Sequence, residues 1–189
     1  MIESFVVKAL EKKVEDVASK GDVRKLKKEI GGVNDATKLP NELRDVYKNC
    51  PKDNGKWSGE RGNSKWRPRE NFTPLKSNPE NKDWQIILKE YGLKQGVKFK
   101  QGEINLKKVS IAEVKITGFS DERSVNFAKA DGQLAAKWKC RSLDVKNFRK
   151  EYSYTWHECK DMKTMQCVPS IVHNNIPHRG GVSEVKQII

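Results

Sequence analysis

The chain has 189 residues, of which 35% are hydrophobic and 8% aromatic, and this is enough to build a folded core. No apolar run is long enough to span a bilayer, and charged residues occur throughout the first twenty positions, so we expect neither a membrane span nor a signal peptide. The formal net charge of +13 at pH 7 favours an anionic partner, with nucleic acid ahead of a membrane surface, over a charge that is only solubilising.

Residues 1–32 are expected to form a helical hairpin that precedes the main domain, residues 33–189. Apolar residues recur at three- and four-residue steps from 2 to 19, with Lys and Glu between them. Asp22 then caps a shorter helix that a glycine pair closes. Three interpretations of this arm are open: packing on the domain, holding a partner, or a remnant of a longer parent chain.

Turn-forming residues dominate positions 33–82, which we expect to wrap the domain without regular elements. Trp57 and Trp66 should keep this stretch ordered. Between them lies a glycine-rich segment whose backbone can approach a phosphate, with Arg61 and Lys65 as pairing cations. The alternative is a structural loop that the two tryptophans hold in place.

Helices and strands are predicted for most of positions 83–152. The expected elements are a helix at 84–91, strands near 97–99, 104–106 and 111–116, a helix from Ser120 to about 135, and a helix at 143–152 opened by Ser142. Basic residues gather at the end of this region, and there we expect Arg149 and Lys150 to contact phosphates.

The segment that follows contains all three histidines of the chain, at positions 157, 173 and 178. The pattern predicts a strand at 152–157, a turn at 160–163, a second strand at 164–168 and a short helix at 170–174 that Pro169 introduces. One histidine then ends a strand, while the other two lie on and after a helix.

This layout suits metal-assisted hydrolysis of a phosphodiester. One neutral imidazole, with an unperturbed pKa of about 6.5, takes a proton from water while other ligands hold a divalent cation at the scissile phosphate. On the residues alone, structural histidines in a non-catalytic nucleic-acid-binding module remain the alternative.

The order of residues in this segment resembles the HNH/endonuclease VII superfamily nucleases marked by a WHH motif, which are commonly toxin domains of bacterial polymorphic toxins. The residues that carry the resemblance are Trp156-His157, Val168-Pro169, His173 and His178-Arg179-Gly180-Gly181. DNase colicins have a related ending, with two histidines followed by Arg-Gly. The resemblance implies an α+β fold with a treble-clef-like ββα-metal finger at 152–181, at the C-terminus of a basic body.

The resemblance also implies roles for the site residues. We expect His157 to be the general base and His173 and His178 to be metal ligands, with Arg179 clamping a phosphate. Glu158 stands where the motif has a second histidine, and it would be a further ligand or would orient His157. The second assignment exchanges the first two roles, with His157 on the metal and Glu158 as the base.

The implied function is that of a metal-dependent endonuclease that hydrolyses DNA with little sequence preference and uses one divalent ion, Mg²⁺, Zn²⁺, Ni²⁺ or Mn²⁺. As a secreted or delivered toxin it would act in the target-cell cytoplasm and be neutralised by a cognate immunity protein, which we expect to be acidic because the toxin is basic. An RNase toxin is the alternative enzyme.

The four cysteines, at positions 50, 140, 159 and 167, contain no Cys-x-x-Cys pair, so a structural zinc site of the usual spacing is not expected. We expect buried free thiols. A disulfide between Cys159 and Cys167 across a hairpin is sterically open but not required.

Overall fold

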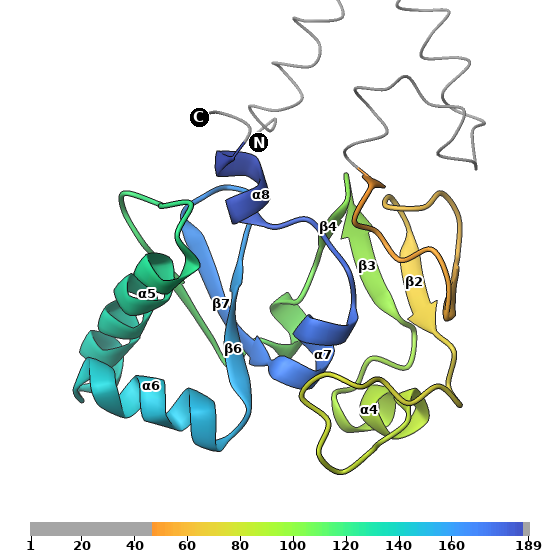
Figure 1. Ribbon diagram of the computed structural model, residues 1–189, viewed down its shortest axis with the longest axis horizontal. Coiled ribbons are helices and arrows are strands. Elements are labelled where there is room, and N and C mark those ends of the chain that lie inside the picture. The colour runs from red at the N-terminus through yellow and green to blue at the C-terminus, as the bar shows by residue number, and fades with distance from the viewer. Residues whose placement is uncertain (1–46, 187–189) are drawn as a thin grey trace, which may run out of the picture.

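The computed structural model describes residues 47–186, and the helical arm expected at 1–32 lies outside them. The described chain has an α+β fold in which two small antiparallel sheets lie side by side (Figure 1). Among these residues, no helix is long and apolar enough to cross a membrane.

The first sheet has the strand order β1-β2-β3-β4. Its strands are β1 (Gly55–Trp57), β2 (Lys65–Pro68), β3 (Val97–Lys100) and β4 (Glu103–Ile104). Helix α4 (Trp84–Glu90) begins after Asp83, whose carboxylate accepts the Ile86 N–H at 3.0 Å. Trp84 and Ile87 of this helix are buried in one hydrophobic core with Trp66 of β2.

The hairpin formed by β1 and β2 corrects the expectation of an irregular wrap through positions 33–82. Trp57 pairs with Trp66 in the register of the two strands, and residues alternate between exposed and buried along β2. These strands have only three and four residues, and Gly55 and Pro68 bound them, so their period-two pattern is too short to stand out from the surrounding turns.

The second sheet has the strand order β5-β7-β6. Its strands are β5 (Ala112–Lys115), β6 (Tyr154–Glu158) and β7 (Thr164–Pro169). Between β5 and β6 the chain forms α5 (Arg123–Trp138) and α6 (Ser142–Glu151), which cover one face of this sheet (Figure 1). The remaining helices are a 3-10 turn η2 (Lys107–Val109), α7 (Ser170–Asn175) and α8 (Gly181–Val185).

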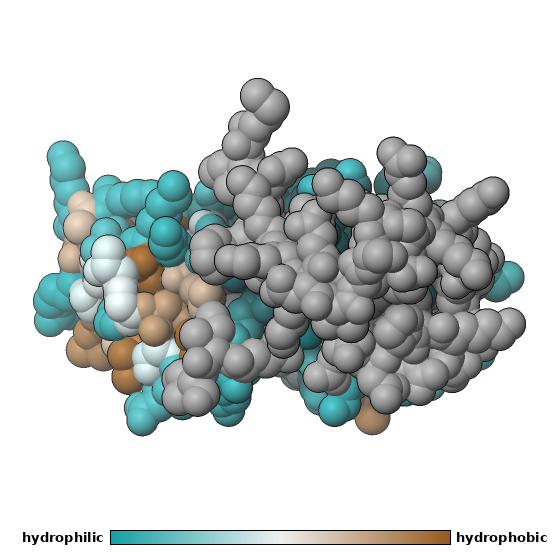
Figure 2. Space-filling model, turned by 90° about the horizontal axis from the view of Figure 1, so that it is seen from above, coloured by the Kyte–Doolittle hydropathy of each residue, from teal (hydrophilic) through white to brown (hydrophobic). Residues whose placement is uncertain are grey.

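Helix α6 begins at Ser142, one residue before the predicted start at about 143, whereas α5 begins three residues later than Ser120. The Ser120 hydroxyl accepts the Glu122 N–H at 3.1 Å, so it forms a turn before the helix rather than the cap of the helix. Both helices carry exposed apolar side chains, among them Val125, Trp138 and Leu143. Figure 2 shows apolar side chains gathered at this end of the molecule among hydrophilic ones.

Strand β7 separates two hydrophobic cores. Met165 and Cys167 belong to the core under α5 and α6, while Val168 belongs to the core that contains α4, α7 and the first sheet. Strand β6 alternates in the same way, because successive side chains of a strand point to opposite faces. Trp156 therefore packs under the helices with Cys167, and His157 lies on the opposite face, toward α7.

All four cysteines are free, so the bridge between Cys159 and Cys167 is not formed. Cys50 and Cys167 are buried as expected, whereas Cys159 is half-buried and Cys140 is exposed. Burial raises the pKa of Cys50 to about 11 and that of Cys167 to about 12, which keeps both thiols neutral.

A buried ion pair joins the two helices to the sheet. The Nε and Nη2 atoms of Arg149 donate to the two oxygens of the Asp131 carboxylate, at 2.8 and 2.6 Å, and the Trp156 indole N–H donates to the same carboxylate at 2.8 Å. Arg149 is only 9% exposed. Its predicted contact with nucleic acid therefore finds no support in this fold, because the side chain is engaged inside the protein.

Asp131→Ala should lower the free energy of unfolding by about 3–5 kcal/mol, because it leaves the charge of Arg149 buried without its partner. Urea denaturation followed by circular dichroism measures this loss. The control is Glu90→Ala, which removes an exposed ion pair with Lys82 and should cost far less. Equal losses in the two variants would contradict this account.

Candidate functional site

The three histidines converge on one point. The ring centroids of His157 and His173 are 5.4 Å apart, those of His157 and His178 are 4.9 Å apart, and those of His173 and His178 are 4.8 Å apart. One ring nitrogen from each lies within 4.8 Å of the others. Three imidazoles at this separation form a group that can hold a single metal ion.

The local fold explains this convergence. His157 pairs with Gln166 across the β6–β7 hairpin, and β7 then ends at Pro169, which also caps the start of α7. His173 lies in the last turn of this six-residue helix. Pro177 cannot continue the helix, so the extended chain after Ile176 brings His178 back to the other two rings.

Two of the three imidazoles are oriented by an oxygen that can only accept a hydrogen bond. The Nδ1 atom of His178 lies 2.7 Å from the Ile176 carbonyl oxygen, and that of His173 lies 3.0 Å from the Asn174 side-chain oxygen. Each Nδ1 must therefore carry the proton, which leaves the Nε2 lone pair available to a metal.

Burial holds the three imidazoles neutral. It lowers the pKa of His157 well below its ordinary value, lowers that of His173, and lowers that of His178 to about 3; for His157 and His178 the nearby imidazoles add to the effect. His157 is 1% exposed, and neither of its ring nitrogens has a hydrogen-bond partner among the described residues. A neutral imidazole with an unused lone pair is the form that binds a metal, so the residues fit a divalent cation.

Glu158 lies beside the histidines but faces α5. Its carboxylate accepts a hydrogen bond from Asn126 Nδ2 at 2.9 Å and pairs with Arg123 Nε at 2.9 Å. Burial raises the pKa of Glu158, while the bonds from Asn126 and Arg123 oppose that rise. The same three histidines, Glu158 and Arg123 line one cavity of about 280 Å³.

The predicted phosphate-binding residues are dispersed. Lys65 and Lys150 are exposed, on β2 and α6 respectively. Arg61 donates to the Tyr47 carbonyl oxygen at 3.1 Å, and Arg179 is buried with its Nε atom 2.8 Å from the Glu184 carboxylate. None of these four is among the side chains that line the histidine cavity.

Two basic residues that the sequence did not single out do line this cavity, Lys76 and Arg123. The Lys76 backbone bonds the Asn175 side chain in both directions, at 2.9 and 2.6 Å, so α7 fixes its position. No local pattern indicates a contact between residues 99 positions apart. Arg123 lies in the first turn of α5. The sequence predicted a helix start close to this position, at Ser120, but it gave no direct sign that Arg123 reaches the histidines.

Asp161 and the glycine pair at 180 and 181 have structural roles near the site. Asp161 accepts bonds from the backbone N–H groups of Lys163 and Thr164, at 3.0 and 2.7 Å, and so forms the turn between β6 and β7. The glycine pair at 180 and 181 brings the chain against the carbonyl oxygens of Glu158 and Cys159, where an added Cβ would lie 2.8 and 2.6 Å away.

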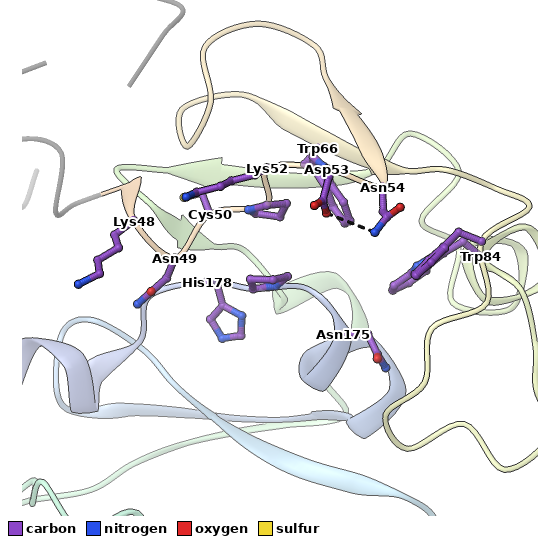
Figure 3. Close-up of a pocket in the computed structure, with 13 residues that line it drawn as sticks. Lys48, Asn49, Cys50, Lys52, Asp53, Asn54, Trp66, Trp84, Asn175 and His178 are labelled. Atoms are coloured by element: carbon purple, nitrogen blue, oxygen red, sulfur yellow. Dashed lines mark hydrogen bonds between the residues drawn. The ribbon is translucent and has the colours of Figure 1, made fainter. Parts of the chain in front are cut away.

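A larger cavity, of about 520 Å³, borders the histidine cavity at Pro177 and His178. Figure 3 shows its lining, with Trp66, Lys52 and Asn54 on one side and His178 and Asn175 on the other. The hollow around the histidines therefore continues toward the first sheet.

Comparison with known proteins finds a similarity between the region of this site and one nuclease family. Residues 94–180 match the family model described as the DNase/tRNase domain of colicin-like bacteriocin. The matched region runs from the segment before β3 through His178 and contains all three histidines and Glu158. No curated protein sequence matches the chain significantly. The match supports a bacteriocin nuclease domain.

Zn²⁺ should bind the full chain with one ion per molecule and raise its melting temperature, because a ligand held 100-fold above its Kd adds about 2.7 kcal/mol to stability. His173→Ala should abolish this rise, since it removes one of three ligands. Isothermal titration calorimetry and thermal denaturation measure both effects, with Glu90→Gln as a surface control. Unchanged Zn²⁺ affinity in His173→Ala would exclude the three-histidine site.

Proposed function

We propose that this chain is a metal-dependent endonuclease that hydrolyses DNA and acts as an antibacterial toxin domain. The observation that carries the proposal is the convergence of three neutral imidazoles inside the region that matches the bacteriocin nuclease family. We assign the nuclease to residues 33–189, with β6, β7 and α7 as the ββα-metal finger within 152–181. When bound, a divalent cation would stabilise the negative charge that develops on the scissile phosphate.

Of the two role assignments that the sequence left open, the geometry favours the second. The His157 ring lies 5.4 and 4.9 Å from the other two rings, which are 4.8 Å apart, and its nitrogens have no partner among the described residues. We therefore propose that His157, His173 and His178 are all metal ligands. Glu158 then becomes the general base that accepts a proton from the attacking water.

The surroundings of Glu158 support this role. Asn126 is fully buried and also bonds the backbone of Ser120 in both directions, at 2.8 and 2.7 Å, so its amide is rigidly held. This amide and Arg123 fix the carboxylate beside the histidines. A carboxylate held in one orientation needs little reorganisation before it accepts a proton.

Arg123 is the side chain that we propose to bind the scissile phosphate. Its side chain is 62% exposed although its Nε atom is paired with Glu158, and a guanidinium carries further N–H donors that match phosphate oxygens. Lys76 lines the same cavity and supplies a second cation. Lys65 and Lys150, both exposed, remain proposed contacts for more distant phosphates.

DNA is the proposed substrate, and the partner is a cognate immunity protein. The net charge of +13 suits both a polyanionic substrate and an acidic inhibitor that competes for the same surface. The toxin would be delivered to the cytoplasm of a target cell. An RNase toxin is the second candidate, because the family description names a tRNase as well as a DNase.

Plasmid DNA should be nicked by the full chain in the presence of Mg²⁺, Mn²⁺, Ni²⁺ or Zn²⁺ and left intact in EDTA. Gel electrophoresis of plasmid DNA, with structured RNA assayed in parallel, distinguishes the two enzymes. DNA cleavage that His173→Ala abolishes, with the circular dichroism spectrum unchanged, supports the proposal. Binding without cleavage of either polymer would show a non-catalytic module, and cleavage of RNA alone would show an RNase.

Glu158→Gln should lower the cleavage rate by about 10²–10⁴-fold because the amide cannot accept the proton. Zn²⁺ affinity should change little, since this side chain is not a ligand in the proposed assignment. His157→Ala should lose cleavage and Zn²⁺ binding together. The reverse pattern, with Zn²⁺ affinity kept in His157→Ala, would restore His157 as the base; Glu90→Gln is the matched control.

A further inference from the structure

The three histidines differ in how their second ring nitrogen is used. In His173 and His178 this nitrogen is Nδ1, and an oxygen acceptor holds it. His157 is the most buried of the three, yet neither of its nitrogens has a partner among the described residues. A metal-binding imidazole generally donates its second N–H to a carboxylate, a carbonyl or water, which fixes both the tautomer and the ring orientation.

The carboxylate of Glu103 lies close to His157. A Glu103 oxygen, a His157 ring nitrogen and the Cys159 sulfur all lie within 4.8 Å of one another. Glu103 is on β4, in the first sheet, and its Oε1 atom accepts the backbone N–H of Lys160 at 2.8 Å. This bond attaches β4 to the turn after β6 and holds the carboxylate beside the histidine.

We propose that Glu103 is the positioning residue of His157 and accepts the proton on the ring nitrogen that faces away from His173 and His178. The proposal rests on the metal site described above. One carboxylate oxygen serves Lys160 and the second serves His157, so both donors are satisfied by a group with two acceptors. The other nitrogen of His157 then presents its lone pair to the cation.

Cys159 is the alternative acceptor for the His157 N–H, but its thiol is less suited to this role than a carboxylate. A thiol is a weak hydrogen-bond acceptor, and only a thiolate would match a carboxylate. Burial, with Glu103 and Asp161 nearby, raises the pKa of the Cys159 thiol and keeps it protonated.

Glu103→Gln isolates the proposed contact. The variant amide keeps one oxygen for the Lys160 N–H, but it presents its NH₂ group, a donor, to His157. The His157 nitrogen that faces position 103 must then accept a hydrogen bond, so the ring proton moves to the other nitrogen. That other nitrogen is the one whose lone pair would bind the cation. The tautomer of His157 should invert in the metal-free protein, and Zn²⁺ affinity should fall by about 10–100-fold.

Two-bond ¹H–¹⁵N spectra of the ¹⁵N-histidine-labelled, metal-free full chain report the tautomer directly. With three histidines in the sequence, the spectrum contains three ring systems, and His157→Gln assigns one of them. Calorimetric titration with Zn²⁺ gives the affinity. Glu90→Gln removes the same charge on the surface of α4 and should change neither measurement.

Inversion of the His157 tautomer in Glu103→Gln, with His173 and His178 unchanged, supports the proposal even if the chain cleaves no nucleic acid. An unchanged His157 tautomer would overturn it, whatever the Zn²⁺ affinity. A shift produced by Cys159→Ala but not by Glu103→Gln would overturn it in favour of the thiol. Because the spectra are recorded without metal and without substrate, failure of the proposed nuclease activity is read separately, from the plasmid assay.

Discussion

The alternation of side chains along β6 is the constraint on which the rest of this structure depends. Trp156 faces α5 and α6, His157 faces α7, and Glu158 faces α5 again. A slip of one residue in the pairing with β7 would turn His157 into the helix-covered core and Trp156 toward α7. The ion pair of Asp131 and Arg149 opposes such a slip, because the Trp156 indole is bonded to it.

The polar groups on the two faces of β6 differ in whether they have hydrogen-bond partners. On the helix face, Asn126 and Arg123 of α5 hold the Glu158 carboxylate, and Asn126 is itself held by the Ser120 backbone. On the other face, the imidazoles lie close together, and the one from β6 has no partner among the described side chains. A fully bonded network rigidifies a fold, whereas buried nitrogens without partners are what a ligand can satisfy. The strand thus separates a carboxylate that is held by hydrogen bonds from an imidazole that has no partner among the described residues.

The sequence predicted the histidine segment well and the rest of the site poorly. The two strands, the short helix after Pro169 and the grouping of His157, His173 and His178 follow from a local pattern and a resemblance that covers about thirty residues. The β1–β2 hairpin was too short to give a period. Arg149 was predicted from its charge and Arg179 from the resemblance, and neither signal indicated the partners, Asp131 on α5 and Glu184 on α8. Lys76 and Glu103 reach the site only through contacts between distant segments.

The three imidazoles come from positions 157 to 178, so their convergence closes a loop of only about twenty residues. The entropy lost on closing a short loop is small, and native contacts that are close in sequence generally form early in folding. We therefore expect the hairpin with α7 to assemble before the first sheet docks against it. This order of events would make the histidine cluster part of the folding nucleus as well as the proposed metal site.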